Sequence, residues 1–235
     1  MVNHHKIANI LYLWILSMVG FIIILPSMNN LYSGIINSMP STYLMLTQAI
    51  ITTGIYATIG SLLAPRIGFN PPIISYILNK QKIYPPIRKQ IYYSTIFGVI
   101  GAVILFMTSA EFSIYLKQFS IISRITGAGL YEEVMARWFL MSFFVWIFWC
   151  IFNRKSTNPK NIIIWLGIIV SNLLFIIGHY PAISILISDN LLILKMFSWM
   201  FIITLPWGWL FWKFGIECVI IAHSIFHVVF ILLQL

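Results

Sequence analysis

Residues 128–153 read AGLYEEVMARWFLMSFFVWIFWCIFN, and this stretch decides how the rest of the chain is interpreted. Its second half is apolar enough to lie in lipid as a helix. Its first half carries two carboxylates and a guanidinium, those of Glu132, Glu133 and Arg137, in just over one helical turn. Each such charge costs about 2.5–3.5 kcal/mol at the centre of a bilayer on insertion scales. Groups with this cost usually face a polar cavity and serve a function, so we interpret the stretch as a candidate active site.

The composition indicates a polytopic membrane protein. Of the 235 residues, 60% are hydrophobic and 8% are charged, whereas soluble domains carry about 25% charged residues. Apolar runs close to the ~20 residues that a helix needs to cross a bilayer cover residues 8–26, 43–64, 91–109, 128–153, 161–180, 190–212 and 215–234. We therefore expect an all-α transmembrane helical bundle of about seven spans.

The chain divides into two expected parts. Residues 1–110 would form N-terminal transmembrane helices with a long basic loop at 65–90, and residues 111–235 would form a catalytic helical core. Basic residues give a formal charge of +9, and they gather at helix ends. We interpret them as topology signals and contacts with anionic lipid, and not as a nucleic-acid surface. The positive-inside rule then puts the N-terminus and the basic loops at 65–90 and 154–160 on the cytoplasmic side, and the C-terminus outside.

The two carboxylates of the central stretch are not equivalent. Positions i and i+4 share one face of a helix, so Glu133 and Arg137 are predicted to form an ion pair. Glu132 points about 100° away from that face. An acid left without a partner in a buried setting is suited to act as a general base or acid near neutral pH. We assign that role to Glu132, with the Glu133–Arg137 pair as its support.

Three histidines lie in the apolar spans further along the chain. His179 ends the fifth span, and His223 and His227 lie in the last one, four positions apart and therefore on one helical face. Imidazole titrates in the physiological range and binds metals in its neutral form. The remaining histidines lie at the N-terminus, at positions 4 and 5. Every histidine beyond that terminus thus belongs to one of two short motifs.

Taken together, the three motifs resemble the signature of a known family. In order, they are Glu132-Glu133-x-x-x-Arg137, Phe175-x-x-x-His179 and His223-x-x-x-His227. This order resembles that of the CPBP family, which groups the CAAX endoproteases with bacterial Abi-type proteins and with bacteriocin-processing or bacteriocin-immunity proteins. The resemblance covers about residues 125–235. It implies a multi-pass integral membrane protein, with a bacterial cell membrane as the expected location.

The resemblance also implies roles for the motif residues. Glu132 and His179 would activate the water that attacks the scissile amide, and His223 would hold that water or stabilise the oxyanion. Glu133, Arg137 and Phe175 would support these groups.

One position departs from the family pattern. His227 stands where family members usually have Asn or Asp. A neutral imidazole there could donate a hydrogen bond to an oxyanion, as Asn would, or could bind a metal ion.

A zinc site is the open alternative to a metal-free mechanism. Four side chains are candidate ligands for a tetrahedral site with an open position, namely those of Glu132, His179, His223 and His227. The sequence has no HExxH motif. Carboxylates and imidazoles suffice for general-base hydrolysis without a metal. We favour the metal-free mechanism, with no certain cofactor.

Three functions are compatible with these residues. The first is an intramembrane endopeptidase that cleaves a membrane-associated or lipid-modified peptide, with the bilayer as its environment and no nucleic-acid partner. The second is a non-proteolytic bacteriocin-immunity or partner-binding protein of the same fold. The third is a proton-coupled transporter, because Glu and His side chains within helices also form proton relays. We favour the endopeptidase, since the sequence shows no inverted repeat of the transporter type. No oligomeric state is predicted.

Overall fold

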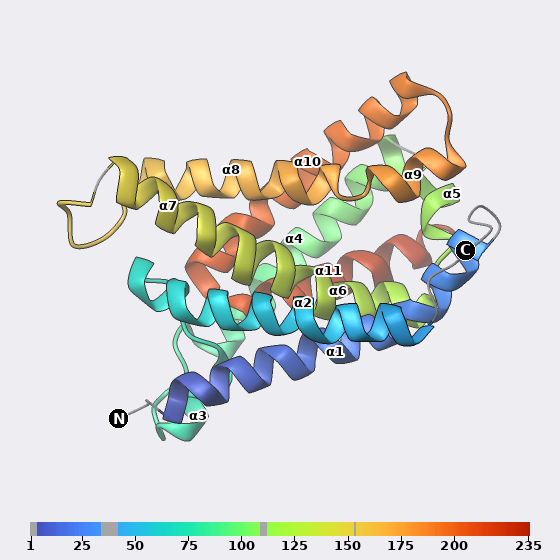
Figure 1. Cartoon of the computed structure of the whole chain (residues 1–235). Helices are drawn as coiled ribbons and strands as arrows, with labels where there is room; N and C mark the ends of the chain where they lie inside the picture. The colour runs from blue at the N-terminus through green and yellow to red at the C-terminus, as the bar shows by residue number, and fades with distance from the viewer. Residues whose placement is uncertain (1–3, 34–41, 109–111, 153) are drawn as a thin grey trace.

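The structure, a computed structural model, describes residues 4–33, 42–108, 112–152 and 154–235. Over these residues the chain is a bundle of helices without a strand (Figure 1). Six of its helical stretches are long and apolar enough to cross a membrane, and a seventh apolar helix at the C-terminus is shorter. The predicted all-α transmembrane bundle is confirmed, with a span count close to seven.

Five of the apolar helices are single, uninterrupted elements. They are α1 (His4–Ser33), α2 (Thr42–Leu63), α4 (Ile87–Thr108), α10 (Asn190–Phe214) and the shorter α11 (Ile216–Leu232). Short elements lie in the connections between them: η1 (Ala64–Ile67), α3 (Ile73–Leu78) and α5 (Phe112–Leu116). The chain reverses between α10 and α11 at Gly215, whose φ of 94° lies in the region that favours glycine.

The central stretch is one long helix assembled from four segments. They are η2 (Ser123–Ala128), α6 (Gly129–Glu133), η3 (Val134–Met141) and α7 (Ser142–Phe152). Both η segments are π-helical, a form that is rare in proteins and frequent at functional sites. The apolar helix begins at Ser123 and not at residue 128 as predicted. The prediction missed its first turn because Ser123 and Arg124 interrupt the apolar pattern, although both side chains are buried.

The fifth span is also longer than predicted and is bent. It consists of α8 (Asn161–Ile177) and α9 (Tyr180–Leu186), joined through Gly178 and His179. Pro181, at the start of α9, has no N–H for a continuous helical hydrogen-bond pattern, so the bend falls immediately before it. His179 therefore lies at a bend inside the bundle and not at the end of a span.

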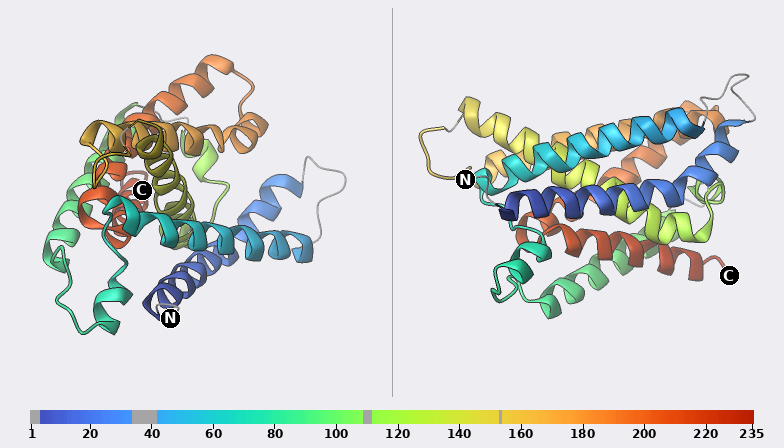
Figure 2. Two further views of the ribbon diagram at one scale, coloured as in Figure 1. Left: turned by 60° about the vertical axis from the view of Figure 1, so that its left-hand side comes forward. Right: turned by 60° about the horizontal axis from the view of Figure 1, so that its bottom comes forward.

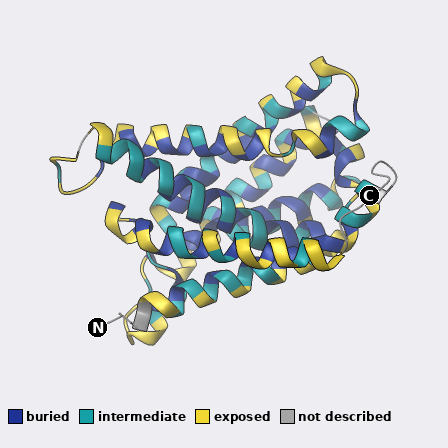
Figure 3. Cartoon of the chain, in the orientation of Figure 1, coloured by how far each residue is buried: buried dark blue, intermediate teal, exposed yellow. Residues whose placement is uncertain are grey.

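The outer faces of the bundle are apolar, as lipid contact requires. Large exposed side chains include Ile15, Ile22, Ile55, Leu62 and Ile177. Figure 3 shows the buried residues on the inward faces of the helices. Charged residues buried in this interior are Arg124, Glu133 and Arg137. The interior thus contains charges in a frame that is otherwise apolar.

Helices from both predicted parts of the chain enclose this interior. Helix α1 packs against α2, η2 and α6, and α4 packs along α11 (Figure 2). Gly20 of α1 and Gly127 of η2 let the two backbones approach closely, since a Cβ on Gly20 would lie 2.8 Å from the carbonyl oxygen of Gly127. The boundary near residue 110 stays a prediction.

The ends of the bundle differ in charge. The N-terminus, α3 and the loop at 154–160 lie at one end, and the C-terminus lies at the opposite end (Figure 1). The basic segments at 65–90 and 154–160 therefore share an end, as the predicted topology requires. Which end faces the cytoplasm stays a prediction.

Candidate active site

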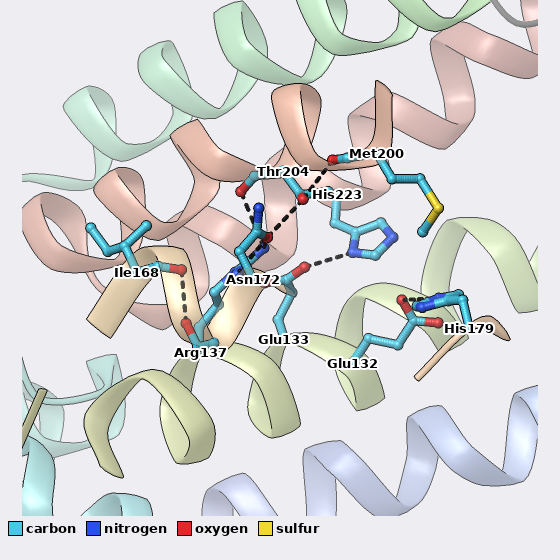
Figure 4. A network of polar contacts seen from close by, with 10 residues as sticks. Glu132, Glu133, Arg137, Ile168, Asn172, His179, Met200, Thr204 and His223 are labelled. Carbon is cyan, nitrogen blue, oxygen red and sulfur yellow. Dashed lines mark hydrogen bonds and ion pairs between the residues drawn. The ribbon is translucent and has the colours of Figure 1, made fainter. Parts of the chain in front are cut away.

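Glu133 lies at the centre of a buried hydrogen-bonded network. Its side chain is fully buried, and its Oε2 accepts a hydrogen bond from Nε of Arg137 at 3.2 Å. Its Oε1 accepts one from Nδ1 of His223 at 2.8 Å. The predicted Glu133–Arg137 ion pair is confirmed, and the carboxylate also bridges to α11 (Figure 4).

The guanidinium of Arg137 is satisfied on every side. Its Nη1 and Nη2 each donate to Oδ1 of Asn172 at 3.3 Å, and Nη2 also donates to the backbone oxygen of Thr204 at 3.2 Å. The Thr204 hydroxyl donates to the same amide oxygen at 2.7 Å. The guanidinium carbon lies 5.6 Å from the ring centroid of Phe175. This arrangement connects the central helix with α8 and α10.

Glu132 points away from that network, towards His179 (Figure 4). Its side chain keeps 21% of its surface exposed, whereas that of Glu133 keeps none. Oε2 of Glu132 lies 3.9 Å from Nε2 of His179. This separation is too long for a direct hydrogen bond and leaves room for a water that bridges the two groups. The adjacent carboxylates therefore differ, and Glu132 is the one open to water.

The backbone partner of His179 determines the tautomer of its neutral ring. Nδ1 lies 2.9 Å from the carbonyl oxygen of Phe175. A carbonyl only accepts, so Nδ1 carries the proton and the neutral ring presents a lone pair on Nε2. The Phe175 ring packs against the imidazole with a centroid distance of 4.7 Å. His179 is thus fixed with an acceptor nitrogen facing Glu132.

His223 and His227 form a linked pair on α11. Glu133 is ionised opposite Arg137, so Nδ1 of His223 is the donor in its bond to that carboxylate. In neutral His223 the Nε2 atom is then an acceptor, and it receives the Nε2 proton of His227 at 3.2 Å. Nδ1 of His227 is left as a lone pair, and it is buried without a partner. A neutral His227 therefore presents an acceptor and becomes a donor at Nδ1 only when it gains a proton.

One cavity connects these groups. Its volume is about 80 Å³, several times the 10–15 Å³ that one water needs. Glu132, His179, His223 and His227 all line it, so the four predicted catalytic side chains share one space. Glu133 and Arg137 do not line it. They lie behind it, as supporting groups would.

A second, larger cavity adjoins the first. Its volume is about 280 Å³, and Glu132 and His179 line both spaces. Apolar side chains make up most of its wall, and those that α1 contributes are Ile24, Met28, Leu31 and Tyr32. The N-terminal part of the chain thus helps to enclose the site. Glu132 and His179, the candidate acid–base pair, therefore lie where the two cavities meet.

A metal ion needs several candidate ligands grouped around one point. Among the described residues, no group of three His, Cys, Asp or Glu side chains is placed to share one ion. A catalytic zinc site needs three protein ligands and an open position. The described arrangement does not meet this requirement, and metal dependence stays a prediction.

Sequence reasoning missed three polar residues of the site. Asn172 and Thr204 hold Arg137, and Arg124 lines the smaller cavity. A signal existed for Asn172, which precedes His179 by seven positions and so lies near the same face of the fifth span. Thr204 carries no such signal. Arg124 was missed because the predicted span begins at residue 128, four positions after it.

Comparison with known proteins gives one match. Residues 115–229 match the family model described as type II CAAX prenyl endopeptidase Rce1-like. The matched segment runs from α5 almost to the end of α11 and contains all three motifs. No curated protein and no solved structure matches the chain significantly.

Proposed function

Through its C-terminal half the chain belongs to the Rce1-like family of type II CAAX prenyl endopeptidases, and from this premise we propose that it hydrolyses a peptide bond of a membrane-associated or lipid-modified peptide. The observation that carries the proposal is the Glu132–His179 pair, whose facing atoms are 3.9 Å apart on the wall of a shared cavity. Two acceptors at this separation can each receive one hydrogen of the same water.

The reaction begins with that water. Glu132 takes one proton as the water oxygen attacks the scissile carbonyl carbon, while the lone pair on Nε2 of His179 holds the second hydrogen. The carbonyl oxygen becomes an oxyanion. When the intermediate collapses, the C–N bond breaks and the leaving nitrogen takes the proton from Glu132. The products are a carboxylic acid and an amine, and Glu132 returns to its ionised form.

The His223–His227 pair supplies a further hydrogen-bond acceptor. Nδ1 of the neutral His227 keeps its lone pair and can accept a hydrogen bond from a water or a peptide N–H in the cavity. The Nε2–H of His227 is bonded to His223, whose Nδ1 donates to Glu133, so the orientation of the ring is fixed. A His–His pair would therefore replace the Asn or Asp that relatives usually have at position 227.

The apolar second cavity fits the expected substrate. A lipid-modified or strongly apolar peptide segment would occupy the space lined by α1 and α8, next to Glu132 and His179. Burial of apolar area contributes roughly 25 cal/mol per Å² to such binding. The peptide bond would then lie where the two cavities meet.

The test is a peptidase assay of the purified protein in lipid vesicles on a peptide library, with and without a metal chelator. Wild type is expected to cleave in both conditions. Glu132→Gln should reduce turnover by about 10²–10⁴-fold, the usual contribution of general acid–base catalysis. Glu217→Gln is the matched control, since Glu217 bonds to Tyr12 and to the Ile73 N–H and lines neither cavity. Full activity of Glu132→Gln would exclude the mechanism, and loss of activity with chelator would require a metal.

A further inference from the structure

Arg124 is a buried cation without a partner. Its side chain is 8% exposed, and neither Nε nor Nη1 has a hydrogen-bond partner. No carboxylate pairs with it among the residues that the structure describes. Arg137, thirteen positions later, is fully satisfied. Because an unpaired buried charge is costly, Arg124 is expected to meet its counter-charge in a ligand.

The position of Arg124 indicates where that ligand lies. Arg124 lines the same cavity as Glu132, His223 and His227. Trp207 lines it too, and its indole N–H is also buried without a partner. A guanidinium and an indole N–H are donors only. The lining of the cavity therefore includes hydrogen-bond donors and a positive charge, which suit an oxyanion.

From this geometry, and resting on the proposed function, we propose that Arg124, assisted by Trp207, binds the C-terminal carboxylate of the substrate peptide. A guanidinium matches a carboxylate with two parallel hydrogen bonds. The motif for which the family is described, C-a-a-X, stands at a chain terminus. Its free carboxylate is the negative group that every such substrate carries, whatever its side chains are.

The spacing along the central helix agrees with this assignment. Arg124 precedes Glu132 by eight positions, and eight residues of helix rise by at most about 12 Å. Three residues of extended peptide span roughly 10–11 Å. A substrate with its terminal carboxylate at Arg124 would therefore present to Glu132 a peptide bond about three residues from its end. The anchor would act as a ruler for the cleavage position.

The test compares peptides with a free C-terminal carboxylate and the same peptides with a C-terminal amide. For wild type, amidation should lower kcat/KM by about 10- to 100-fold, the value of a charge-assisted hydrogen-bonded pair. Most of this loss should appear in KM. Arg124→Gln should process acid and amide peptides equally, and Arg124→Lys should retain part of the preference. Trp207→Phe removes the N–H together with part of the buried ring, and it should reduce the preference by about threefold to tenfold.

A matched control separates a specific contact from general electrostatics. Lys117 is exposed and does not line the cavity, so Lys117→Gln removes one positive charge nearby and should keep the full preference for the free acid. Peptides with two to five residues after the scissile bond test the ruler, and three should be the best length. The proposal is overturned if wild type makes no distinction between acid and amide, a result that needs no variant to fold.

Failure of the anchor and failure of hydrolysis give different results. Binding of both peptides to Glu132→Gln, alone and combined with Arg124→Gln, is measured in vesicles of zwitterionic lipid and in vesicles with added anionic lipid. Preference for the acid that depends on Arg124, without cleavage by wild type, would uphold the anchor and reject hydrolysis. Cleavage by wild type without a preference for the acid peptide would uphold hydrolysis and reject the anchor. Arg124→Gln could instead weaken binding of the acid and the amide peptide equally, and only in vesicles with anionic lipid. That result would show that Arg124 binds a lipid phosphate, and it would overturn the proposal.

Discussion

Two polar regions lie side by side in this bundle and differ in how completely their groups are satisfied. We call the first the clamp, which consists of Glu133, Arg137, Asn172, Thr204 and His223. Its members bind one another across the central helix, α8, α10 and α11. The second, which we call the cavity wall, consists of Glu132, His179, His227, Arg124 and Trp207, and two members of the clamp, Thr204 and His223, also reach the same cavity. Three members of the cavity wall have buried polar atoms without a partner.

This difference separates support from chemistry. A buried charge whose partners are all supplied by the protein holds helices in place, and removing one partner is costly. A buried polar group without a partner destabilises the folded state and is available to a ligand. Adjacent residues of one helix, Glu132 and Glu133, thus belong to opposite regions.

The largest effect on stability is expected at the two buried arginines, and in opposite directions. Arg137→Met should cost about 3–5 kcal/mol of unfolding free energy, since it leaves Glu133 buried without its cation. Arg124→Met should leave the substrate-free protein as stable as wild type or more stable, because it removes an unpaired buried charge. Unfolding of both variants in the same detergent provides the measurement. Equal destabilisation would abolish the distinction between the clamp and the cavity wall.

A smaller effect is expected at Asn172. Its amide oxygen accepts from Arg137 and from Thr204, so Asn172→Leu leaves Nη1 of Arg137 buried without an acceptor, whereas the Thr204 hydroxyl keeps the backbone oxygen of Met200. The expected cost is about 1–3 kcal/mol. Asn172→Asp keeps the acceptor and should be the milder change. A Leu variant as stable as wild type would show that the clamp does not hold α8 in place.

The smallest effect is expected at Thr204. Thr204→Val removes the hydroxyl that donates to Asn172 but keeps the backbone oxygen that accepts from Arg137. The expected cost is about 0.5–1.5 kcal/mol, with peptide cleavage unchanged. A large loss of cleavage at unchanged stability would show that Thr204, which also lines the smaller cavity, takes part in the reaction and not only in the clamp.

Much of this arrangement could be predicted from the sequence. Apolar runs predicted the bundle, since only helices of that length satisfy their backbone groups in lipid. The spacing of Glu133 and Arg137 predicted their ion pair, and the positions of His223 and His227 predicted a shared face. These inferences succeed because helical periodicity places side chains without knowledge of the tertiary fold.

The features of the site that were not predicted depend on tertiary contacts, which helical periodicity does not encode. The link from His223 to Glu133 joins residues 90 positions apart, and nothing in either motif indicates it. The start of the central helix was misplaced because Arg124 interrupts the apolar pattern, and its burial is known only from the structure. His179 lies at the bend before Pro181, seven residues before the end of its span, whereas the sequence placed it at the end of a span.

The central claim is that Glu132 reacts and Glu133 supports. It is tested most directly by measuring kcat/KM and the melting temperature of Glu132→Gln and Glu133→Gln side by side. We predict that Glu132→Gln lowers kcat/KM by at least about 100-fold at an unchanged melting temperature, and that Glu133→Gln lowers the melting temperature because Arg137 loses its counter-charge. Wild-type turnover by Glu132→Gln, or equal loss of thermal stability in both variants, would contradict the account.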